Sequence, residues 1–336
     1  MVLKEKIKAM AELGNYIDQL IADEQNQIYK MAEAENPWFI LPFVKTALTG
    51  IRKYLHVDNL RRWTDPYPFT AESRKLIGLI LAGNIPLVGF HDLLSVLLSG
   101  HTANLKMSHQ DQVLMDHMVE VLTGIEPRFR YRIRKAGTIE KSDAVIATGS
   151  DNSARYFYAY YQHMPHLIRK NRTSVAVLDG KESAENLRDL GEDIFLYFGL
   201  GCRNVSLIFV PENYDPRRLI NCLTDRYRLL DHRKYRNNYI HQRSMDEVLE
   251  KEHLDGGFFL LKESDKLVSP VSVLYYSRYT DLPSLQHRLV FNREKIQAVV
   301  CGLPDLESSV PFGQAQFPEP WDYADQVDTM DFLQKL

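Results

Sequence analysis

Cysteines and long apolar runs are both scarce in this sequence. The three cysteines, Cys202, Cys222 and Cys301, are far apart and show no Cys-x-x-Cys spacing. Neither a disulfide framework nor a cysteine zinc site is therefore expected. No stretch approaches the ~18–20 consecutive apolar residues of a membrane helix, and the first residues lack the apolar core of a signal peptide. We expect a cytoplasmic protein without a membrane span.

The sequence also has no excess of charge of one sign. It carries 41 basic and 44 acidic residues, a net charge of −3, which gives no electrostatic reason to expect a nucleic-acid partner. The basic, tyrosine-rich stretch at 226–243 is therefore interpreted as a solvated helix and loop. His163 and His166 are separated by a proline and have no third ligand nearby in sequence, so no metal site is expected.

The Gly-x-Gly-x-x-Gly dinucleotide fingerprint is absent as well, but apolar strands alternate with helices along the chain. An alternation of this kind predicts right-handed crossovers and a mainly parallel sheet, so the expected fold class is α/β. Strands are predicted at 76–81, 102–107, 144–148, 174–178, 204–210, 257–261, 271–276 and 297–300. Helices are predicted at 43–55, 87–98, 108–122, 151–161 and 182–197.

Two segments alternate apolar and polar residues and are interpreted as strands. Residues 128–134 place four arginines on one face, which favours an edge strand guarded by charge. A phosphate site is the alternative, since arginine suits phosphate groups. Residues 327–333, near the C-terminus, could form an added strand.

Two residues could support acyl chemistry. Cys202 follows a Gly-x-Gly turn between a predicted helix and a predicted strand, and a thiolate there would be a strong nucleophile. On its own it is more often a small buried residue. Asn84 lies in the turn after a buried strand, where its amide could donate to an oxyanion or merely bond its own backbone.

Polar residues that could meet a cofactor follow two other strands. Lys106 and Ser108 stand at the end of the second strand, within reach of a ribose or phosphate, although a solvated lysine is the simpler interpretation. Gly149 and Ser150 open a helix whose N–H groups could face a phosphate. The simpler interpretation there is an ordinary helix cap.

Taken together, these segments resemble the aldehyde dehydrogenase superfamily. Residues 82–92 with 100–108 are similar to its cofactor segment, which ends in Lys-x-Ser, and residues 147–150 to its Thr-Gly-Ser loop. Residues 199–202 resemble its nucleophile loop, and 311–313 its late Pro-Phe-Gly turn. Each motif is weak alone, but the four occur in the superfamily's order across residues 75–315.

The resemblance implies a two-lobed fold with mainly parallel sheets. We expect a helical leader at 1–70 packed on a Rossmann-like cofactor lobe at 71–180, a catalytic lobe at 181–310, and the tail at 311–336.

The resemblance also implies roles for the site residues. Cys202 would be the nucleophile and Asn84 the oxyanion donor. Lys106 would contact the adenosine ribose, and Gly149 with Ser150 would lie against the nicotinamide cofactor. The superfamily's glutamate after Lys-x-Ser is His109 here, so we expect Ser108 and His109 to favour NADPH, with NADH also possible.

Two departures from the superfamily narrow the expected reaction. Residues 167–172 replace the stretch that carries the water-activating glutamate, and residues 268–270 replace the one whose glutamate holds the nicotinamide ribose. Without the first glutamate, the acyl group should pass to or from a thiol. The overall pattern resembles the bioluminescence-type fatty acyl-CoA reductases, which implies an acyl-CoA or acyl-carrier thioester substrate.

Other outcomes remain open at this point. An aldehyde dehydrogenase with a relocated base and an inactive nucleotide-binding partner subunit are the alternatives to the reductase. A homo-oligomer is possible, although the bridging hairpin of the superfamily is missing before residue 75.

Overall fold

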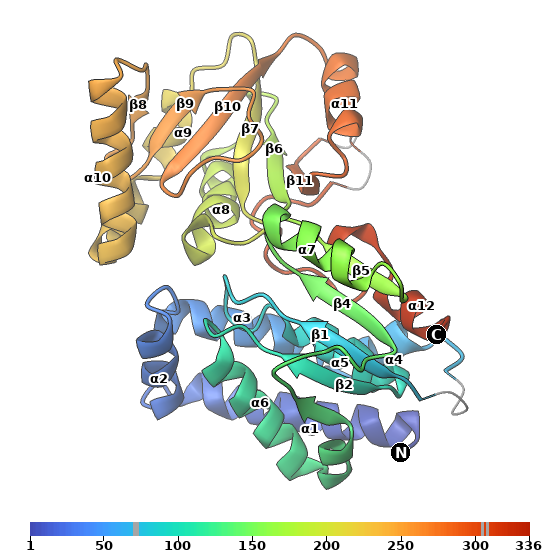
Figure 1. The fold of residues 1–336 in the computed structure, drawn as a ribbon. Coiled ribbons are helices and arrows are strands. Elements are labelled where there is room, and N and C mark those ends of the chain that lie inside the picture. The colour runs from blue at the N-terminus through green and yellow to red at the C-terminus, as the bar shows by residue number, and fades with distance from the viewer. Residues whose placement is uncertain (70–73, 304–305, 307–308) are drawn as a thin grey trace. The chain divides into compact units, whose positions relative to one another are not determined.

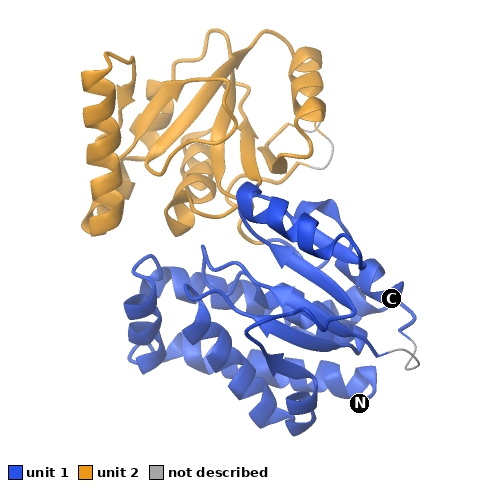
Figure 2. Cartoon of the chain, in the orientation of Figure 1, with its two compact units in different colours: residues 1–171, 318–336 blue, residues 172–317 orange. Residues whose placement is uncertain are grey.

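The computed structural model describes residues 1–69, 74–303, 306 and 309–336. The chain divides into two compact units, residues 1–171 with 318–336 and residues 172–317 (Figure 2). Unit 1 is therefore built from both ends of the chain. The division at Arg172 gives unit 2 the strand at 173–177, which was expected in the cofactor lobe.

The N-terminal segment is helical, as its apolar spacing predicts. Its helices are α1 (Leu3–Ala22), α2 (Gln27–Glu35), α3 (Leu41–Tyr54) and α4 (Val57–Thr64). Met10, Leu13 and Ile17 recur at helical spacing and are fully buried. These helices share one hydrophobic core with the sheet of unit 1.

That sheet has the strand order of a Rossmann fold. Its strands pair in parallel in the order β3-β2-β1-β4-β5 (Figure 1). They are β1 (Leu76–Ile80), β2 (Thr102–Lys106), β3 (Ile133–Lys135), β4 (Ala144–Thr148) and β5 (His166–Arg169). The connecting helices include α5 (Phe90–Ser99), α6 (Gln112–Ile125) and α7 (Asp151–Tyr161). The order reverses between β1 and β4, the place where such sheets bind ligands.

The arginine-rich segment forms less strand than expected. A 3-10 helix, η1 (Pro127–Tyr131), takes up most of it, and only β3 joins the sheet, at its edge. Pro127 suits the first position of a helical turn, and the Glu126 side chain accepts a hydrogen bond of 3.1 Å from the Arg128 N–H. Local capping therefore overrides the alternation in the sequence.

Unit 2 holds a second sheet, in the order β11-β6-β7-β10-β9-β8. Among its described strands, β8 pairs antiparallel with β9 and the other pairs are parallel. The strands are β6 (Thr173–Val177), β7 (Val205–Pro211), β8 (Leu254–Asp255), β9 (Leu260–Glu263), β10 (Val273–Tyr279) and β11 (Ile296–Cys301). The helices are α8 (Ala184–Phe195), η2 (Leu196–Gly199), α9 (Arg217–Cys222), η3 (Thr224–Asp231), α10 (Arg233–Val248) and α11 (Leu282–Phe291).

The C-terminal tail returns to unit 1 as a helix, so the expected added strand is wrong. After η4 (Ala324–Gln326) comes α12 (Thr329–Gln334). Asp328 caps this helix by accepting a hydrogen bond of 2.8 Å from the Asp331 N–H. Met330 and Leu333 are fully buried in the core of unit 1, and burial of this helical face outweighs the short alternating pattern. No helix within the described ranges has the length and apolarity needed to cross a membrane.

Candidate active site

The expected cofactor residues gather at one edge of the unit 1 sheet. In the parallel register Ile80 pairs with Lys106 on one side and Ala147 on the other, so β1, β2 and β4 end at the same level. Asn84, Lys106 and Ser150 follow or end these strands, and all three are exposed. The structure therefore brings together, within unit 1, polar residues that are far apart in sequence.

The Asn84 turn packs directly on the loop after β2. A Cβ built on Gly83 would come within 2.6 Å of the Ser108 hydroxyl and 3.2 Å of the Asp111 Cβ, so only glycine permits this approach. Ser108 accepts a hydrogen bond of 3.2 Å from the Gln110 N–H. It does not cap α6, whose N-cap is Asp111. His109 in the same loop is exposed.

Asp111 is a residue of this edge that the sequence did not reveal. Its side chain is buried, and Oδ2 accepts a hydrogen bond of 2.8 Å from the N–H of Leu87, which has φ of 57°. In the described part of the chain, Oδ1 has no hydrogen-bond partner. Burial raises the pKa of the Asp111 carboxyl well above its ordinary value, against the lowering effect of the Leu87 N–H. Asp111 therefore supports, through the Leu87 N–H, the turn that presents Asn84.

Ser150 and Gly149 occupy the start of α7. The Ser150 hydroxyl accepts a hydrogen bond of 3.2 Å from the Ser153 N–H, which is an ordinary N-cap. The cap leaves the exposed first turn of an 11-residue helix at the carboxyl end of β4. Such a helix start favours anions through its unpaired N–H groups and its dipole.

Residues 167–172, which replace the superfamily's stretch with the water-activating glutamate, contribute buried side chains to unit 1. Leu167 on β5 is buried in the core of unit 1. Arg169 is also buried. Its Nη1 donates to both carboxylate oxygens of Asp92 at 2.7 and 2.6 Å, and its Nη2 donates a 2.8 Å hydrogen bond to Thr329. This stretch thus holds α5 and α12 in place and presents no carboxylate.

In unit 2, Cys202 lies in a short loop between η2 and β7 and is half-buried. The backbone just before it is unusual, because Tyr197, Phe198 and Gly199 have φ of 53°, 57° and 76°. Left-handed conformations at non-glycine residues cost on the order of 1–3 kcal/mol each and concentrate at functional sites. The Phe198 ring is held by the His232 ring, at 4.3 Å between centroids.

Hydrogen bonds fix the loop from both sides. The Asn204 side chain accepts a bond of 2.8 Å from the Gly201 N–H and donates to the carbonyls of Asp193, Ile194 and Leu196 at 3.1, 3.3 and 2.9 Å. The Ser174 hydroxyl on β6 donates to the Cys202 carbonyl at 3.1 Å. The sequence did not reveal Asn204 or Ser174.

The Pro-Phe-Gly turn is joined to the same helix end. Asp193 on α8 is fully buried and accepts hydrogen bonds of 2.7 and 2.9 Å from the N–H groups of Gly313 and Ala315. Burial raises the pKa of the Asp193 carboxyl to about 7, although these two N–H groups act in the opposite direction. The late turn and the Cys202 loop, both expected from the sequence, are thus connected through the end of α8.

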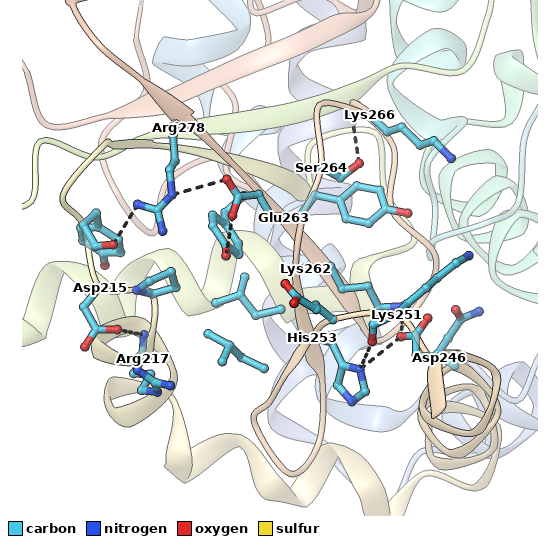
Figure 3. Close-up of a pocket in the computed structure, with 18 of the residues that line it drawn as sticks. Asp215, Arg217, Asp246, Lys251, His253, Lys262, Glu263, Ser264, Lys266 and Arg278 are labelled. Atoms are coloured by element: carbon cyan, nitrogen blue, oxygen red, sulfur yellow. Dashed lines mark hydrogen bonds and ion pairs between the residues drawn. The ribbon is translucent and has the colours of Figure 1, made fainter. Parts of the chain in front are cut away.

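A cavity of about 1120 Å³ lies elsewhere in unit 2. It is lined by the loop after β7, by α10 and by β9 and β10, and its walls carry the ion pairs Lys262–Asp246 and Arg278–Glu263 (Figure 3). Glu212 on its wall follows the carboxyl end of β7, whereas Cys202 precedes the amino end of this strand. A seven-residue strand spans about 20 Å, so the cavity is separate from the cysteine loop.

Comparisons with known proteins agree with this architecture. HpcC from Thermus thermophilus superposes with a TM-score of 0.64 at 12% identity, covering 92% of this chain and 71% of that one. The NAD⁺ complex of an aldehyde dehydrogenase from Bacillus cereus gives 0.61 at 12% identity, covering 90% and 72%. A putative aldehyde dehydrogenase from Burkholderia cenocepacia gives 0.58 at 13% identity, covering 89% and 78%. At these identities the similarity establishes the fold, which confirms the expected α/β class.

No curated protein matches the chain. A family model does match it: the model described as "Acyl-CoA reductase (LuxC)" covers residues 4–235, more than half of the chain, from α1 into α10. The matched region includes the Asn84 turn, the edge of the unit 1 sheet and the Cys202 loop. The chain therefore belongs to the LuxC family of acyl-CoA reductases, oxidoreductases that act on acyl and aldehyde groups.

Proposed function

We propose that this protein reduces an acyl thioester to an aldehyde through an acyl group carried on Cys202. The observation that carries the proposal is the burial of Leu167 where the aldehyde dehydrogenase pattern has its water-activating glutamate. A thioester on Cys202 that no carboxylate helps to hydrolyse persists long enough to be reduced. The family match, which spans both Leu167 and Cys202, supports the same direction.

Cys202 acts as the nucleophile. Its thiolate attacks the carbonyl carbon of the substrate, the bond from that carbon to the sulfur of coenzyme A or of an acyl carrier breaks, and that thiol leaves with a proton. Cys202 is half-buried, and its backbone carbonyl accepts a hydrogen bond from the Ser174 hydroxyl. After reduction, the carbon–sulfur bond to Cys202 breaks and the aldehyde is released.

Asn84 and the Cys202 N–H donate hydrogen bonds to the oxyanion that forms in both halves of the reaction. A positioned amide donor is effective because it does not have to reorient as charge develops. The support for Asn84 is its exposed place in a turn that Gly83, Ser108 and Asp111 hold tightly. A turn fixed in this way presents its side chain at a constant position.

The edge of the unit 1 sheet suits a phosphate-bearing dinucleotide. Exposed Lys106 and the start of α7 at Ser150 provide a cation and N–H donors where the strand order reverses. Lys106 would hold the adenosine ribose, Gly149 and Ser150 would lie against the cofactor, and Ser108 with His109 would favour NADPH over NADH. When bound, the reduced nicotinamide supplies the hydride that converts the acyl group on Cys202 to an aldehyde.

The test is incubation of the purified protein with acyl-CoAs of increasing chain length, and with an acyl-carrier thioester, in the presence of NADPH or NADH. We expect loss of the reduced-nicotinamide absorbance with one trapped aldehyde formed per cofactor oxidised. Oxidation of aldehydes to carboxylates, without thioester reduction, would identify an aldehyde dehydrogenase. Thermal stabilisation by NADPH without any turnover would identify an inactive subunit. Either result would overturn the proposal.

A further inference from the structure

The backbone ahead of Cys202 is strained at two residues that are not glycine. Tyr197 and Phe198 both take the left-handed conformation ahead of Gly199, and residues of this kind persist only when their surroundings fix them. The end of α8 also has to be stabilised, because the last carbonyls of a helix lack partners within the helix. The left-handed residues and the end of α8 both precede Cys202 by fewer than ten residues.

The Asn204 side chain bonds to the end of α8 and to the loop before Cys202. Its amide donates to the carbonyls of Asp193, Ile194 and Leu196, which lie at the end of α8, and its oxygen accepts from the N–H of Gly201. The residue is only 2% exposed, and its three bonds to the carbonyls are buried, whereas the bond from Gly201 is half-buried. One buried amide therefore links the helix end to the residue directly before the cysteine.

We propose that Asn204, assisted by Ser174, is the positioning residue that holds the Cys202 loop in its reactive shape. Asn204 fixes the loop on the side of α8, and the Ser174 hydroxyl fixes the Cys202 carbonyl from β6. Backbone bonds lock the same turn, from the Asn204 N–H to Gly201 at 3.0 Å and from the Ser174 N–H to the Asn204 carbonyl at 3.1 Å. The inference rests on the proposed function only in taking Cys202 as the nucleophile.

Neither aspartate nor alanine can replace this amide. Aspartate has the same shape but no donor for the three carbonyls, and its charge would face their negative ends. Alanine removes the donor to three buried carbonyls and the acceptor for the half-buried Gly201 N–H, and each buried group left unpaired costs about 1–3 kcal/mol. The loop would then relax away from its left-handed conformation, and the sulfur would move.

The experiment compares Asn204→Ala and Ser174→Ala with Asn186→Ala. Asn186 belongs to the capping box at the other end of α8, so its loss weakens the same helix without touching the loop. Two measurements are made below the unfolding temperature of each variant. One is the steady-state rate of acyl-CoA reduction. The other is the rate at which iodoacetamide alkylates Cys202, read by mass spectrometry against Cys222 in the same molecule.

For Asn204→Ala we expect kcat to fall on the order of 10²-fold, the scale of a misplaced reacting group, with the KM for NADPH unchanged. For Ser174→Ala we expect about a fivefold loss, the scale of one hydrogen bond. Alkylation of Cys202 should change in both variants while that of Cys222 does not. Asn186→Ala should lower the unfolding temperature and leave kcat and alkylation unchanged.

A folded Asn204→Ala variant with normal kcat and normal Cys202 alkylation would overturn the inference. So would an equal loss of kcat in Asn186→Ala, since that would mean that helix stability alone matters. If Asn204→Ala does not fold, the Ser174→Ala variant decides by the same two measurements. If the wild-type protein reduces no acyl-CoA, the proposed function fails, while the alkylation rates still test the role of Asn204.

Discussion

The Asp193 carboxylate accepts a hydrogen bond of 2.7 Å from the N–H of Gly313, a residue 120 positions later in the chain. Asp193 is fully buried, and its pKa is raised to about 7 by burial. Between pH about 4 and about 7, the folded chain keeps a proton on Asp193 that the unfolded chain has lost. Raising the pH through this range therefore lowers the free energy of unfolding.

We predict that this dependence on pH is weaker in Asp193→Asn, which cannot titrate. Across this pH range, the change in the free energy of unfolding should differ between wild type and variant by up to about 4 kcal/mol. Each pKa unit corresponds to about 1.4 kcal/mol. Urea unfolding at several pH values measures it. Glu185→Gln, an exposed change on the same helix, should keep the wild-type dependence. Parallel curves for wild type and Asp193→Asn would contradict the raised pKa.

Cys202→Ala should abolish acyl-CoA reduction and leave binding of the nicotinamide cofactor intact, because the proposed cofactor residues lie in unit 1 and Cys202 in unit 2. Turnover and fluorescence titration with NADPH measure the two effects separately. Cys222→Ala and Cys301→Ala serve as controls and should retain turnover. Appreciable acyl-CoA reduction by Cys202→Ala would show that Cys202 is not the nucleophile.

Asn84→Ala should lower kcat by roughly 10²–10³, the scale of losing one oxyanion donor. Its fold should be intact, because the side chain is exposed. Steady-state kinetics and circular dichroism test both statements, with Asn237→Ala, an exposed change on α10, as the control. If only the KM changes, Asn84 is a turn residue without a role in the chemical step.

NADPH should be preferred over NADH because His109 stands where a glutamate would repel a 2′-phosphate. Two unit charges ~4 Å apart at an effective dielectric of ~20 interact by ~4 kcal/mol, and solvent reduces this at an exposed position. The ratio of kcat/KM for the two cofactors measures the preference. His109→Glu should shift that ratio toward NADH, and His163→Glu, another exposed change in unit 1, should not. An unchanged ratio in His109→Glu would rule out this account.

The regular elements were predictable from the sequence because their signals are local. The strand at 144–148 has the predicted bounds, and the helix after it ends at Tyr161 as expected. Short alternating stretches were less informative, because capping at Pro127 and Asp328 produced helical turns instead of strands. An alternating stretch of seven residues, such as 128–134 or 327–333, does not outweigh a good cap.

The supporting residues of the site were not predictable in the same way. The sequence predicts roles for Cys202 and Asn84 through loop motifs. The importance of Asn204 depends on carbonyls up to 11 positions away, and that of Asp193 on a turn 120 positions away. Asp111 accepts from Leu87, 24 positions earlier, across the end of the sheet. Contacts of this kind exist only once the chain has folded.

The assembly of unit 1 from both ends of the chain has a consequence for its synthesis. The ribosome completes residues 1–171 long before it reaches Thr329, which accepts a hydrogen bond from Arg169, and Tyr323, which accepts one from Trp63. Until then α5 and β5 lack α12, which contacts α5 and bonds to Arg169 at the end of β5. Unit 1 therefore reaches its final form only after residues 318–336 have been added, although its first 171 residues are made before any part of unit 2.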